Sequence, residues 1–436
     1  MKILILGAAR SGTQAARLLR RHHHQVTLTD RQALAEKQQL QAEGITVYDQ
    51  GHPDFLAQQD WDLVVKNPGI PYHTPFVQAL MQRNARIVNE IEVASWFAPQ
   101  FRYGAVTGTN GKTTTTSLLA HLLRQKWPSS CAAGNIGVPL SEIVMEQGDQ
   151  PTAVALEVAA FQLVALQQFH PEVSVCLNLT PDHLDYFGSL DAYYDAKMLI
   201  WKNQRGDDWF LRNLDDPQIV ARTQQLPCRA VTFSLERSAD LEVAGRQVRL
   251  WGQPLFETSD LKLVGRHNLQ NAMCAAAMAF KMGVEPDRIR QGIREFGGVE
   301  HRIEFVADID GVRYYNDSKG TNVDATCTAL KAFDQPVILL AGGYDKKTGF
   351  EGLRPYLNRI ACMIVYGQTR WQLKELMPQA IVVETMAQAL DQARQIARPG
   401  DVVLLSPVCA SWDQFDDYEQ RGRLFKQQVL SWKSGQ

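Results

Sequence analysis

One short segment of the chain carries the residue types needed to bind a nucleoside triphosphate. A predicted strand, Gly104–Thr107, leads into Gly108-Thr109-Asn110-Gly111-Lys112-Thr113-Thr114, and a helical pattern follows. A strand, glycine-rich loop and helix in this order point backbone N–H groups and a helix N-terminus at phosphate oxygens. We expect Lys112 to reach the terminal phosphates and Thr113 to ligate Mg²⁺. A simple strand-to-helix turn is the alternative, but it would not need a Lys-Thr pair after its second glycine.

Two further polar side chains follow predicted strands of the same region. Glu157 follows Ala153–Leu156, and His183 follows Val173–Leu177 after a short loop. If these strands are parallel, both side chains emerge at the carboxyl edge of the sheet, beside the phosphate loop. The alternatives are a surface carboxylate at a strand end for Glu157 and a helix-capping or core histidine for His183.

A second glycine motif lies near the N-terminus. Gly7-Ala8-Ala9-Arg10-Ser11-Gly12 follows the first predicted strand, and Asp30 ends the second. The spacing is typical of a dinucleotide fingerprint with alanine in place of the middle glycine. Taken alone, it would indicate an NAD-dependent oxidoreductase. A helix N-terminus also binds the diphosphate of UDP, however, so the motif by itself does not determine the reaction.

These motifs are distributed over an α/β chain with three predicted units. Residues 1–93 alternate strands and helices, which predicts a Rossmann-like parallel sheet. Residues 94–297 contain the phosphate loop and predict an ATPase-like, mostly parallel sheet with short antiparallel strands near 241–256. The strand and helix alternation restarts in residues 298–436, which predicts a second Rossmann-like unit. The strands that support these three units are Lys2–Leu6, Gln25–Thr29, Leu63–Val65, Val312–Tyr315, Val337–Leu340, Met363–Val365 and Val402–Leu405, with a helix at Met386–Ala397.

Composition narrows the class of protein. The 436 residues suffice for two to four domains, and the 45 basic and 47 acidic residues nearly cancel. We therefore expect no attraction to nucleic acid or anionic lipid. No apolar run approaches the roughly 18 residues of a membrane span, and Gly7 and Arg10 interrupt the first one, so we expect a cytoplasmic protein. Seven cysteines without a CxxC pair indicate reduced residues, and His22-His23-His24 indicates a solvated helix end.

Several motifs together resemble the Mur ligases, a family that also includes the folylpolyglutamate synthases. Its nucleotide loop resembles Ala105-Val106-Thr107-Gly108-Thr109-Asn110-Gly111-Lys112-Thr113, which has Val106 where the usual P-loop has a glycine. The other motifs span nearly the whole chain in order. They are Gly134-Asn135-Ile136-Gly137, Glu157 with Phe161-Gln162-Leu163, Asp182-His183-Leu184-Asp185, Lys197, Gly265-Arg266-His267-Asn268-Leu269-Gln270-Asn271, His301-Arg302, Asn316-Asp317-Ser318-Lys319 and Ser406-Pro407.

This resemblance implies an ATP-dependent, ADP-forming ligase that makes an amide through an acyl phosphate. Within the family, the segment 406–415 and the short length resemble the members that add D-glutamate to UDP-N-acetylmuramoyl-L-alanine. Those members act in peptidoglycan precursor synthesis, and hence in cell wall biogenesis, cell shape and cell division. We expect a monomer, and the sequence leaves the kinetic order open.

The resemblance also implies two Mg²⁺ ions at the catalytic residues Lys112, Glu157, His183 and Lys197. Thr113 and Glu157 would hold one ion between the β- and γ-phosphates, and His183 would help to hold the second on the acyl carboxylate. Lys197 would be carbamylated, which gives it anionic oxygens that bind metal. On composition alone, Lys197 is an ordinary solvated lysine of a helix.

Ligand contacts follow from the same resemblance. The adenine side is assigned to Asn268 and Asn271, one helical turn apart, with helix capping as the alternative. Ribose and phosphates are assigned to the third unit, which implies domain closure; the residues are Arg302, Asp317 and Lys319. The UDP-sugar positions are Ser11, Asp30, Arg31, Asn67, Gly69 and Asn135, with His183 nearby. The amino-acid positions are Thr321, Lys346, Ser411, Trp412 and Tyr418, with Lys347 as the alternative to Lys346.

Two departures from the family pattern leave the substrate open. The family commonly has two serines where this chain has Ala159-Ala160, and Lys66-Asn67 before Pro68-Gly69 is less typical than a serine. A lost hydroxyl puts one substrate hydrogen bond in doubt. A sister activity, with L-glutamate or another precursor, therefore remains an alternative to the addition of D-glutamate.

Overall fold

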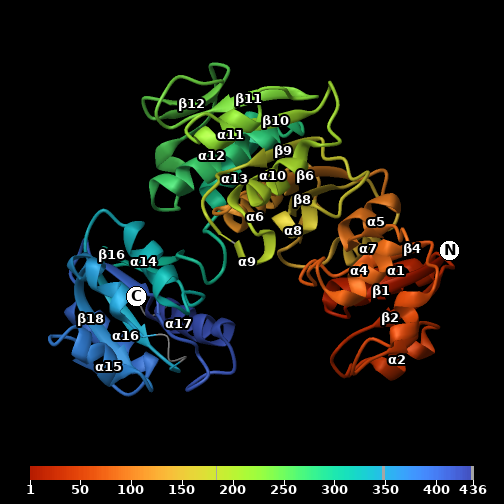
Figure 1. Ribbon diagram of the computed structural model, residues 1–436. Helices are drawn as coiled ribbons and strands as arrows, with labels where there is room; N and C mark the ends of the chain where they lie inside the picture. The colour runs from red at the N-terminus through yellow and green to blue at the C-terminus, as the bar shows by residue number, and fades with distance from the viewer. Residues whose placement is uncertain (183, 346–348, 434–436) are drawn as a thin grey trace. The chain divides into compact units, whose positions relative to one another are not determined.

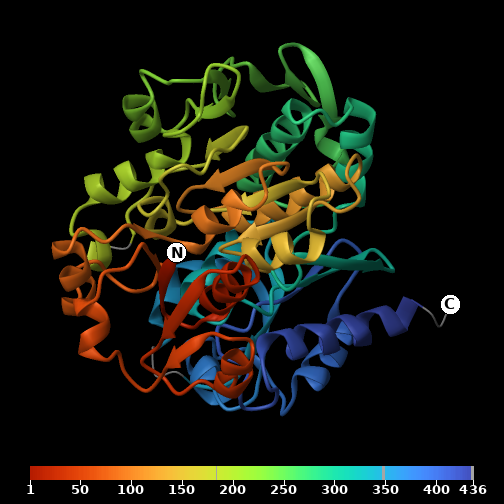
Figure 2. The same ribbon diagram turned by 90° about the vertical axis from the view of Figure 1, so that its right-hand side faces the viewer.

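The computed structural model describes residues 1–182, 184–345 and 349–433, which form an α/β protein built on three sheets (Figures 1 and 2). The contacts divide the chain into two compact units, one of Met1–Glu257 with Gln270–Gly292 and the other of Thr258–Leu269 with Ile293–Gln436. The predicted α/β class with mostly parallel sheets is confirmed. Along the described part of the chain, none of the helices combines the length and apolar character required to cross a bilayer.

The first sheet is parallel throughout, with strand order β3-β2-β1-β4-β5. Its strands are β1 (Lys2–Leu6), β2 (Gln25–Thr29), β3 (Thr46–Tyr48), β4 (Leu63–Lys66) and β5 (Ile87–Val88), and its helices are α1 (Arg10–Arg21), α2 (Lys37–Ala42), α3 (Asp54–Gln58), α4 (Pro75–Gln82) and α5 (Glu90–Trp96). Side chains alternate between two cores, since Ile3 packs with Ala15 on one face and Leu4 packs with Leu80 on the other. Helices on both faces explain why most residues of these strands are buried.

The second sheet has nine strands in the order β14-β13-β12-β11-β10-β9-β6-β8-β7. They are β6 (Arg102–Thr107), β7 (Cys131–Gly134), β8 (Ala153–Glu157), β9 (Val173–Cys176), β10 (Trp209–Asn213), β11 (Arg229–Phe233), β12 (Leu241–Ala244), β13 (Gln247–Leu250) and β14 (Gln253–Glu257). The last two pairings are antiparallel, as predicted for 241–256. Strand β6 lies between β8 and β9, so the loop after β6 is flanked by the ends of both neighbours.

The helices around this sheet begin with α6, which directly follows the phosphate loop. They are α6 (Lys112–Arg124), α7 (Leu140–Gln147), α8 (Ala160–Leu163), α9 (Leu184–Phe187), α10 (Leu190–Met198), α11 (Pro217–Arg222), α12 (Arg266–Lys281) and α13 (Pro286–Glu295), with 3-10 turns η1 (Leu199–Trp201) and η2 (Thr258–Asp260). Helices α1 and α5 of the first sheet pack against α7, which joins the two sheets into one compact unit.

The third sheet has the order β15-β16-β20-β17-β18-β19. Its strands are β15 (Glu304–Ile309), β16 (Val312–Asn316), β17 (Val337–Gly342), β18 (Ile360–Tyr366), β19 (Ile381–Val382) and β20 (Val402–Leu405), and its helices are α14 (Val323–Lys331), η3 (Glu351–Arg359), α15 (Arg370–Leu376), α16 (Met386–Ile396) and α17 (Tyr418–Lys433). Strand β15 is antiparallel to β16 and was not predicted. A two-residue turn with positive φ at Asp310 and Gly311 makes this hairpin.

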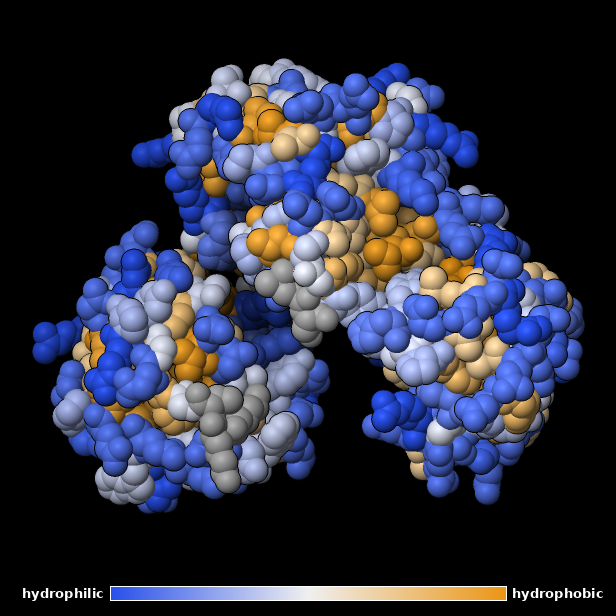
Figure 3. Space-filling view, in the orientation of Figure 1, coloured by the Kyte–Doolittle hydropathy of each residue, from blue (hydrophilic) through white to orange (hydrophobic). Residues whose placement is uncertain are grey.

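The surface shown in Figure 3 is mostly hydrophilic, with apolar residues scattered between polar ones. The long apolar runs lie inside instead. Leu339 and Leu404 belong to the core on one face of the third sheet, and Leu340 and Leu405 belong to the core on the other face. The carboxyl ends of the buried strands are therefore held rigidly, and polar residues that follow them occupy defined positions.

Candidate active site

The phosphate loop connects β6 to α6 through two glycines with positive φ. Gly108 has φ +141° and Gly111, which caps α6, has φ +84°. A Cβ atom at Gly111 would lie 2.4 Å from Oδ1 of Asn271 on α12. Both the backbone conformation and the space therefore require glycine at Gly111.

The loop is also held from the neighbouring strand by Asn178, which follows β9. The N–H of Thr109 donates to the Asn178 carbonyl oxygen at 3.0 Å, and the N–H of Asn110 donates to Oδ1 of Asn178 at 2.8 Å. The Asn178 amide in turn donates to the Asn110 carbonyl at 3.1 Å. Sequence reasoning missed this residue, although its place just beyond the end of β9 was the available signal.

Two lysines converge on the loop. Nζ of Lys112 donates to the carbonyl oxygens of Gly108 and Thr109 at 2.9 and 2.8 Å. Nζ of Lys197, on α10, donates to the same Gly108 oxygen at 2.9 Å and lies 4.6 Å from the centre of the Tyr193 ring. Lys197 is only 2% exposed, and burial together with the charge of Lys112 lowers its pKa to about 8. The alternative of a solvated lysine is wrong.

Glu157 ends β8 beside the same loop, since it pairs with Val106 of β6. Its side chain is 3% exposed, and Oε1 accepts a hydrogen bond from Nδ2 of Asn135 at 2.8 Å. The other oxygen, Oε2, is buried and has no hydrogen-bond partner among the described residues. Because a buried carboxylate oxygen without a partner is costly, this donor set fits a cation between Glu157 and the loop.

The structure describes only part of the predicted metal-binding set. His183 lies outside the described residues. Among the residues that are described, no cluster of three or more His, Cys, Asp or Glu side chains could hold a metal ion. Within the described part of the chain, an ion at Glu157 could take further oxygens from the loop and from a modified Lys197, and the nucleotide itself could supply others.

The two asparagines predicted for adenine have different surroundings. Asn271 is 3% exposed and lies against the loop at Gly111. Asn268 is 8% exposed, and its Nδ2 donates to the carbonyl oxygen of Val264 at 2.8 Å. In that contact the side chain donates to a carbonyl oxygen, so it does not cap the free N–H groups at the start of α12, and the adenine assignment of Asn268 stays a prediction.

The predicted UDP-sugar residues of the first sheet gather at its carboxyl edge. Asp30 accepts hydrogen bonds from the N–H groups of Ala8 and Gln32 at 2.6 and 2.8 Å, so it is tied to the N-terminal glycine motif. Oδ1 of Asn67 accepts from the N–H of Gly69 at 2.9 Å. A Cβ at Gly7 would lie 2.7 Å from Cβ of Asn67. Of the other two residues, Ser11 is half-buried and Arg31 is exposed.

Lys66, which departs from the family pattern, stabilises the turn that follows β4 at this edge of the sheet. It is 1% exposed, and its Nζ donates to the carbonyl oxygens of Asn67 and Ile70 at 3.1 and 2.6 Å. It also lies 4.4 Å from the centre of the Tyr72 ring. Burial lowers its pKa to about 8. Lys66 therefore fixes the conformation of the turn that contains Asn67 and Gly69.

In the other compact unit, Asp317 follows β16 and is 4% exposed. It accepts hydrogen bonds from Oγ of Ser406 at 2.7 Å and from the N–H of Ile303 at 3.2 Å. Burial raises its pKa to about 7, against the opposing effects of these hydrogen bonds. Lys319 lies 5.5 Å from the centre of the Tyr418 ring. The structure thus brings Asp317, Lys319 and Tyr418 into one region of this unit.

The remaining predicted amino-acid contacts are spread over neighbouring loops. Ser411 is 2% exposed, whereas Trp412 is 63% exposed and packs on Tyr344 with ring centres 5.5 Å apart. The N–H of Thr321 donates to the Lys319 carbonyl oxygen at 2.9 Å. Lys346 and the alternative Lys347 lie outside the described residues. Arg302 is exposed.

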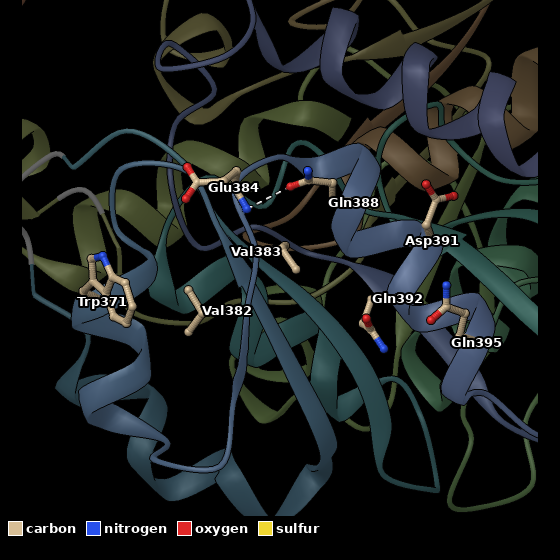
Figure 4. A pocket seen from close by; sticks show the side chains of 8 residues that line it. All are labelled: Trp371, Val382, Val383, Glu384, Gln388, Asp391, Gln392 and Gln395. Carbon is tan, nitrogen blue, oxygen red and sulfur yellow. Dashed lines mark hydrogen bonds between the residues drawn. The ribbon is translucent and has the colours of Figure 1, made fainter.

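A separate pocket of about 530 Å³ lies between α15, β19 and α16 (Figure 4). Its lining contains none of the predicted site residues: Trp371, Val382, Val383, Glu384, Gln388, Asp391, Gln392 and Gln395. Oε1 of Gln388 accepts from the N–H of Glu384 at 3.0 Å and from the N–H of Thr385 at 3.1 Å, and the second bond belongs to the capping box that starts α16. We therefore do not assign the active site to this pocket.

Family models cover most of the chain. The model of the Mur ligase MurD-like N-terminal domain matches residues 1–89, that of the Mur ligase middle domain matches 106–279, and that of the Mur ligase glutamate ligase domain matches 301–409. These matches contain both glycine motifs, Glu157, Lys197 and the Asp317 region. They leave no support for an NAD-dependent oxidoreductase.

Whole-chain relatives agree with these matches. The chain is 39% identical to the UDP-N-acetylmuramoylalanine–D-glutamate ligase of Geobacillus kaustophilus, over 97% of this chain and 96% of that protein. It is also 39% identical to the enzyme of that name from Lacticaseibacillus paracasei, over 99% and 96%. Among solved structures, the UDP-N-acetylmuramate-alanine ligase of Thermotoga maritima matches with a TM-score of 0.57 and 20% identity over 100% of both chains, which supports the fold alone.

Proposed function

The chain belongs to the Mur ligase family, and from that premise we propose that it is an ATP-dependent, ADP-forming ligase that adds D-glutamate to UDP-N-acetylmuramoyl-L-alanine. The named activity of relatives 39% identical over nearly the whole chain supports this substrate pair. The structural observation that carries the proposal is the meeting of Lys112 and buried Lys197 on one carbonyl of the phosphate loop. A site that only bound a nucleotide would not need the second lysine.

The proposed reaction converts a poor leaving group into a good one. A carboxylate oxygen of UDP-N-acetylmuramoyl-L-alanine attacks the γ-phosphorus of ATP, the bond to the β-phosphate oxygen breaks, and ADP leaves. The amine of D-glutamate then attacks the acyl carbon, inorganic phosphate leaves, and the nitrogen loses a proton. The N–H groups of the phosphate loop and the ammonium of Lys112 would bind the phosphates and stabilise their charge.

Magnesium ions fit the residues beside this loop. Thr113 and Glu157 would hold one ion and His183 would help to hold a second, and the ions would neutralise the negative charge of the phosphates and carboxylate. Oε2 of Glu157, which is buried and has no hydrogen-bond partner within the described ranges, supports the first position. Asn135 orients the same carboxylate through its 2.8 Å hydrogen bond.

We further propose that Lys197 is carbamylated. Its neutral amine attacks CO₂, an N–C bond forms, and a proton is released, so that a cationic side chain becomes an anionic one. The lowered pKa of about 8 supports this step, because a substantial fraction of the amine is neutral near physiological pH. The carbamate would orient the groups around the acyl carboxylate, where an ammonium would repel a metal ion.

The remaining ligand assignments follow the three predicted domains, 1–93, 94–297 and 298–436. The first would bind UDP-sugar through Asp30, Asn67 and the N-terminal glycine motif. The second would bind ATP, and the third would supply Asp317, Lys319 and the amino-acid contacts. Closure of the third domain would exclude water from the acyl phosphate. We propose that the protein acts as a monomer in the cytoplasm.

One experiment tests the proposal directly. ADP release is measured with UDP-N-acetylmuramoyl-L-alanine and, in turn, each D- and L-amino acid. We expect release that depends on D-glutamate and requires Mg²⁺. A preference for L-glutamate would instead select the sister activity, whereas no amino-acid-dependent release would overturn the ligase assignment. Thermal stabilisation by the UDP-sugar, with no effect of NAD, provides an independent test of the first domain.

A further inference from the structure

Arg421, on α17, is the largest side chain that is completely buried in the described part of the chain. Its guanidinium donates three hydrogen bonds to two segments. Nε donates to Oγ of Ser318 at 2.9 Å and Nη2 to the Ser318 carbonyl oxygen at 2.8 Å. Nη1 donates to the carbonyl oxygen of Cys409 at 3.2 Å. These contacts connect the segment after β16 to the segment after β20.

The choice of arginine at this position is informative. A buried guanidinium is expensive to desolvate, and here none of the described carboxylates forms an ion pair with Arg421. Its hydrogen bonds go to neutral oxygens, which it contacts in a planar fork that lysine cannot reproduce, and its charge also acts on the nearby buried Asp317. A requirement for packing alone would be met by an apolar side chain at lower cost. The geometry therefore favours a role in which Arg421 fixes the position of the segment after β16 relative to the segment after β20.

The two segments carry residues predicted for different ligands. Ser318 stands between Asp317 and Lys319, which are predicted to contact the nucleotide. Cys409 stands two positions before Ser411, which is predicted to contact the amino acid.

The segments also bind one another directly. Ser406 donates to Asp317 at 2.7 Å, and the N–H of Val408 donates to the Gly320 carbonyl oxygen at 3.0 Å. Ser318 additionally donates from Oγ to the carbonyl oxygen of Tyr418, at the start of α17, at 2.7 Å. Arg421 thus fixes an arrangement in which three segments of this unit meet.

We propose that Arg421 is a positioning residue that couples the nucleotide-binding segment to the amino-acid-binding segment of this ligase. The inference rests on the proposed function, because the two ligands are assigned through it. Arg421 itself touches neither ligand, since it is fully buried. Its loss should therefore weaken the binding of ATP and of D-glutamate together and leave the binding of the UDP-sugar, assigned to the other compact unit, unchanged.

The test compares three variants. Arg421→Met removes all the hydrogen-bond donors of the side chain, and Arg421→Lys keeps the charge but not the planar guanidinium. Ser318→Ala is a smaller change, because it removes only the hydroxyl that accepts from Nε of Arg421. Val429→Ala is the matched control, because Val429 is a fully buried apolar residue of the same helix. We expect KM for ATP and for D-glutamate to rise together, about tenfold to a hundredfold, in the first two variants, as the loss of charge-assisted hydrogen bonds predicts. KM for the UDP-sugar should stay within about twofold, and Val429→Ala should lose stability without changing any KM.

Amide hydrogen exchange gives a readout that needs no turnover. In Arg421→Lys and Ser318→Ala, protection should fall in both 316–321 and 406–412 and stay unchanged in α16. The inference would be overturned if the Arg421 variants kept the wild-type KM values, or if, like Val429→Ala, they only lost stability. A loss of protection in only one of the two segments would also overturn it. If the wild-type protein fails to release ADP, the proposed function fails, and the exchange result still decides whether Arg421 couples the segments.

Discussion

Nζ of Lys197 and the carbonyl oxygen of Gly108 are joined by a 2.9 Å hydrogen bond between α10 and the phosphate loop. The same oxygen accepts from Lys112, so two ammonium groups share one acceptor. Burial is the main cost of ionising Lys197, and the positive charge of Lys112 adds to that cost. The arrangement favours a neutral Lys197, and hence an amine that can react with CO₂.

The first prediction concerns the identity of residue 197. Lys197→Arg retains a cation but cannot form a carbamate, so we expect kcat to fall by about 10²- to 10³-fold, the typical cost of losing one preorganised charged group. Steady-state ADP release measures this. Lys202→Arg, a conservative change at a less buried lysine beyond the same helix, is the control and should keep full activity. Wild-type turnover by Lys197→Arg would exclude a catalytic carbamate.

The second prediction is a pH dependence of carbamate formation. Because the pKa of Lys197 is lowered to about 8, the neutral fraction of its amine rises as the pH increases from 7 to 9. Enzyme depleted of CO₂ should therefore regain activity several-fold faster at pH 8.5 than at pH 7, at equal dissolved CO₂. Recovery that is independent of CO₂ at both pH values would contradict the role proposed for Lys197.

The third prediction concerns the buried oxygen of Glu157. Glu157→Gln keeps the shape and the hydrogen bond from Asn135 but removes the negative charge that a metal ion requires. We expect activity to fall at least about 10²-fold, with a rise in the Mg²⁺ concentration needed for half-maximal rate. Glu146→Gln, at an exposed position of α7, should change neither quantity. An unaltered Mg²⁺ requirement in Glu157→Gln would remove this residue from the metal site.

How far the sequence could predict the molecule depends on the range of the interactions. Strands β1, β2 and β20 have the predicted bounds, because apolar runs bounded by turn residues are local signals. Strand β7 was missed, since its sequence Cys-Ala-Ala-Gly has little intrinsic strand preference and is fixed by pairing with β8. The segment 22–24 follows α1 with His22 and His23 exposed, as predicted for a solvated helix end, and His22 in addition stacks on Phe97 with ring centres 4.0 Å apart.

In the candidate site, too, residues fixed by local signals could be predicted and residues fixed by long-range packing could not. Glu157 could be predicted because a polar residue at the end of a buried parallel strand has a defined position. The burial of Lys197 could not be derived from its helix, since it arises from packing of α10 on the phosphate loop. Asn178 and Arg421 were missed because their partners lie far away in sequence, 68 residues for the Asn110 contact and 103 for the Ser318 contact.

The fourth prediction compares two glycines with positive φ to distinguish the effect of steric overlap from the effect of backbone strain. Gly111→Ala places a Cβ 2.4 Å from Oδ1 of Asn271, whereas at Gly148, which also has positive φ, nothing lies within 4 Å. Both substitutions should cost about 1 kcal/mol of stability from the strained φ, and Gly111→Ala should cost more because of its overlap with Asn271. Only Gly111→Ala should also weaken ATP binding, by about tenfold or more, because the loop must shift where it meets phosphate. Calorimetric titration with a nonhydrolysable ATP analogue distinguishes the two effects.

The last prediction concerns Glu90, at the start of α5, whose Oε1 accepts a hydrogen bond from the N–H of Ser141 on α7 at 2.5 Å. Burial raises its pKa to about 7, from an ordinary value of 4.5. As the pH rises, Glu90 loses its proton near pH 4.5 in the unfolded chain but only near pH 7 in the folded protein. Its contribution to the stability of the folded protein is therefore complete below pH 4.5 and is lost as the pH rises through 7. Glu90→Gln keeps an acceptor and removes the titration. It should therefore be more stable than the wild-type protein at pH 8, by up to about 3 kcal/mol for the shift of the pKa.

The neighbouring Glu92 provides the contrast that makes this result specific. Glu92 is completely buried, and its carboxylate accepts hydrogen bonds from the N–H groups of Gln167, Gln168 and Phe169. In Glu92→Gln the amide N–H₂ group would face these donors, so this variant should be destabilised at every pH. Thermal unfolding of both variants between pH 5 and pH 8 measures the difference. If Glu90→Gln lost stability equally across that range, Glu90 would be ionised in its contact with Ser141 of α7, and the raised pKa would be wrong.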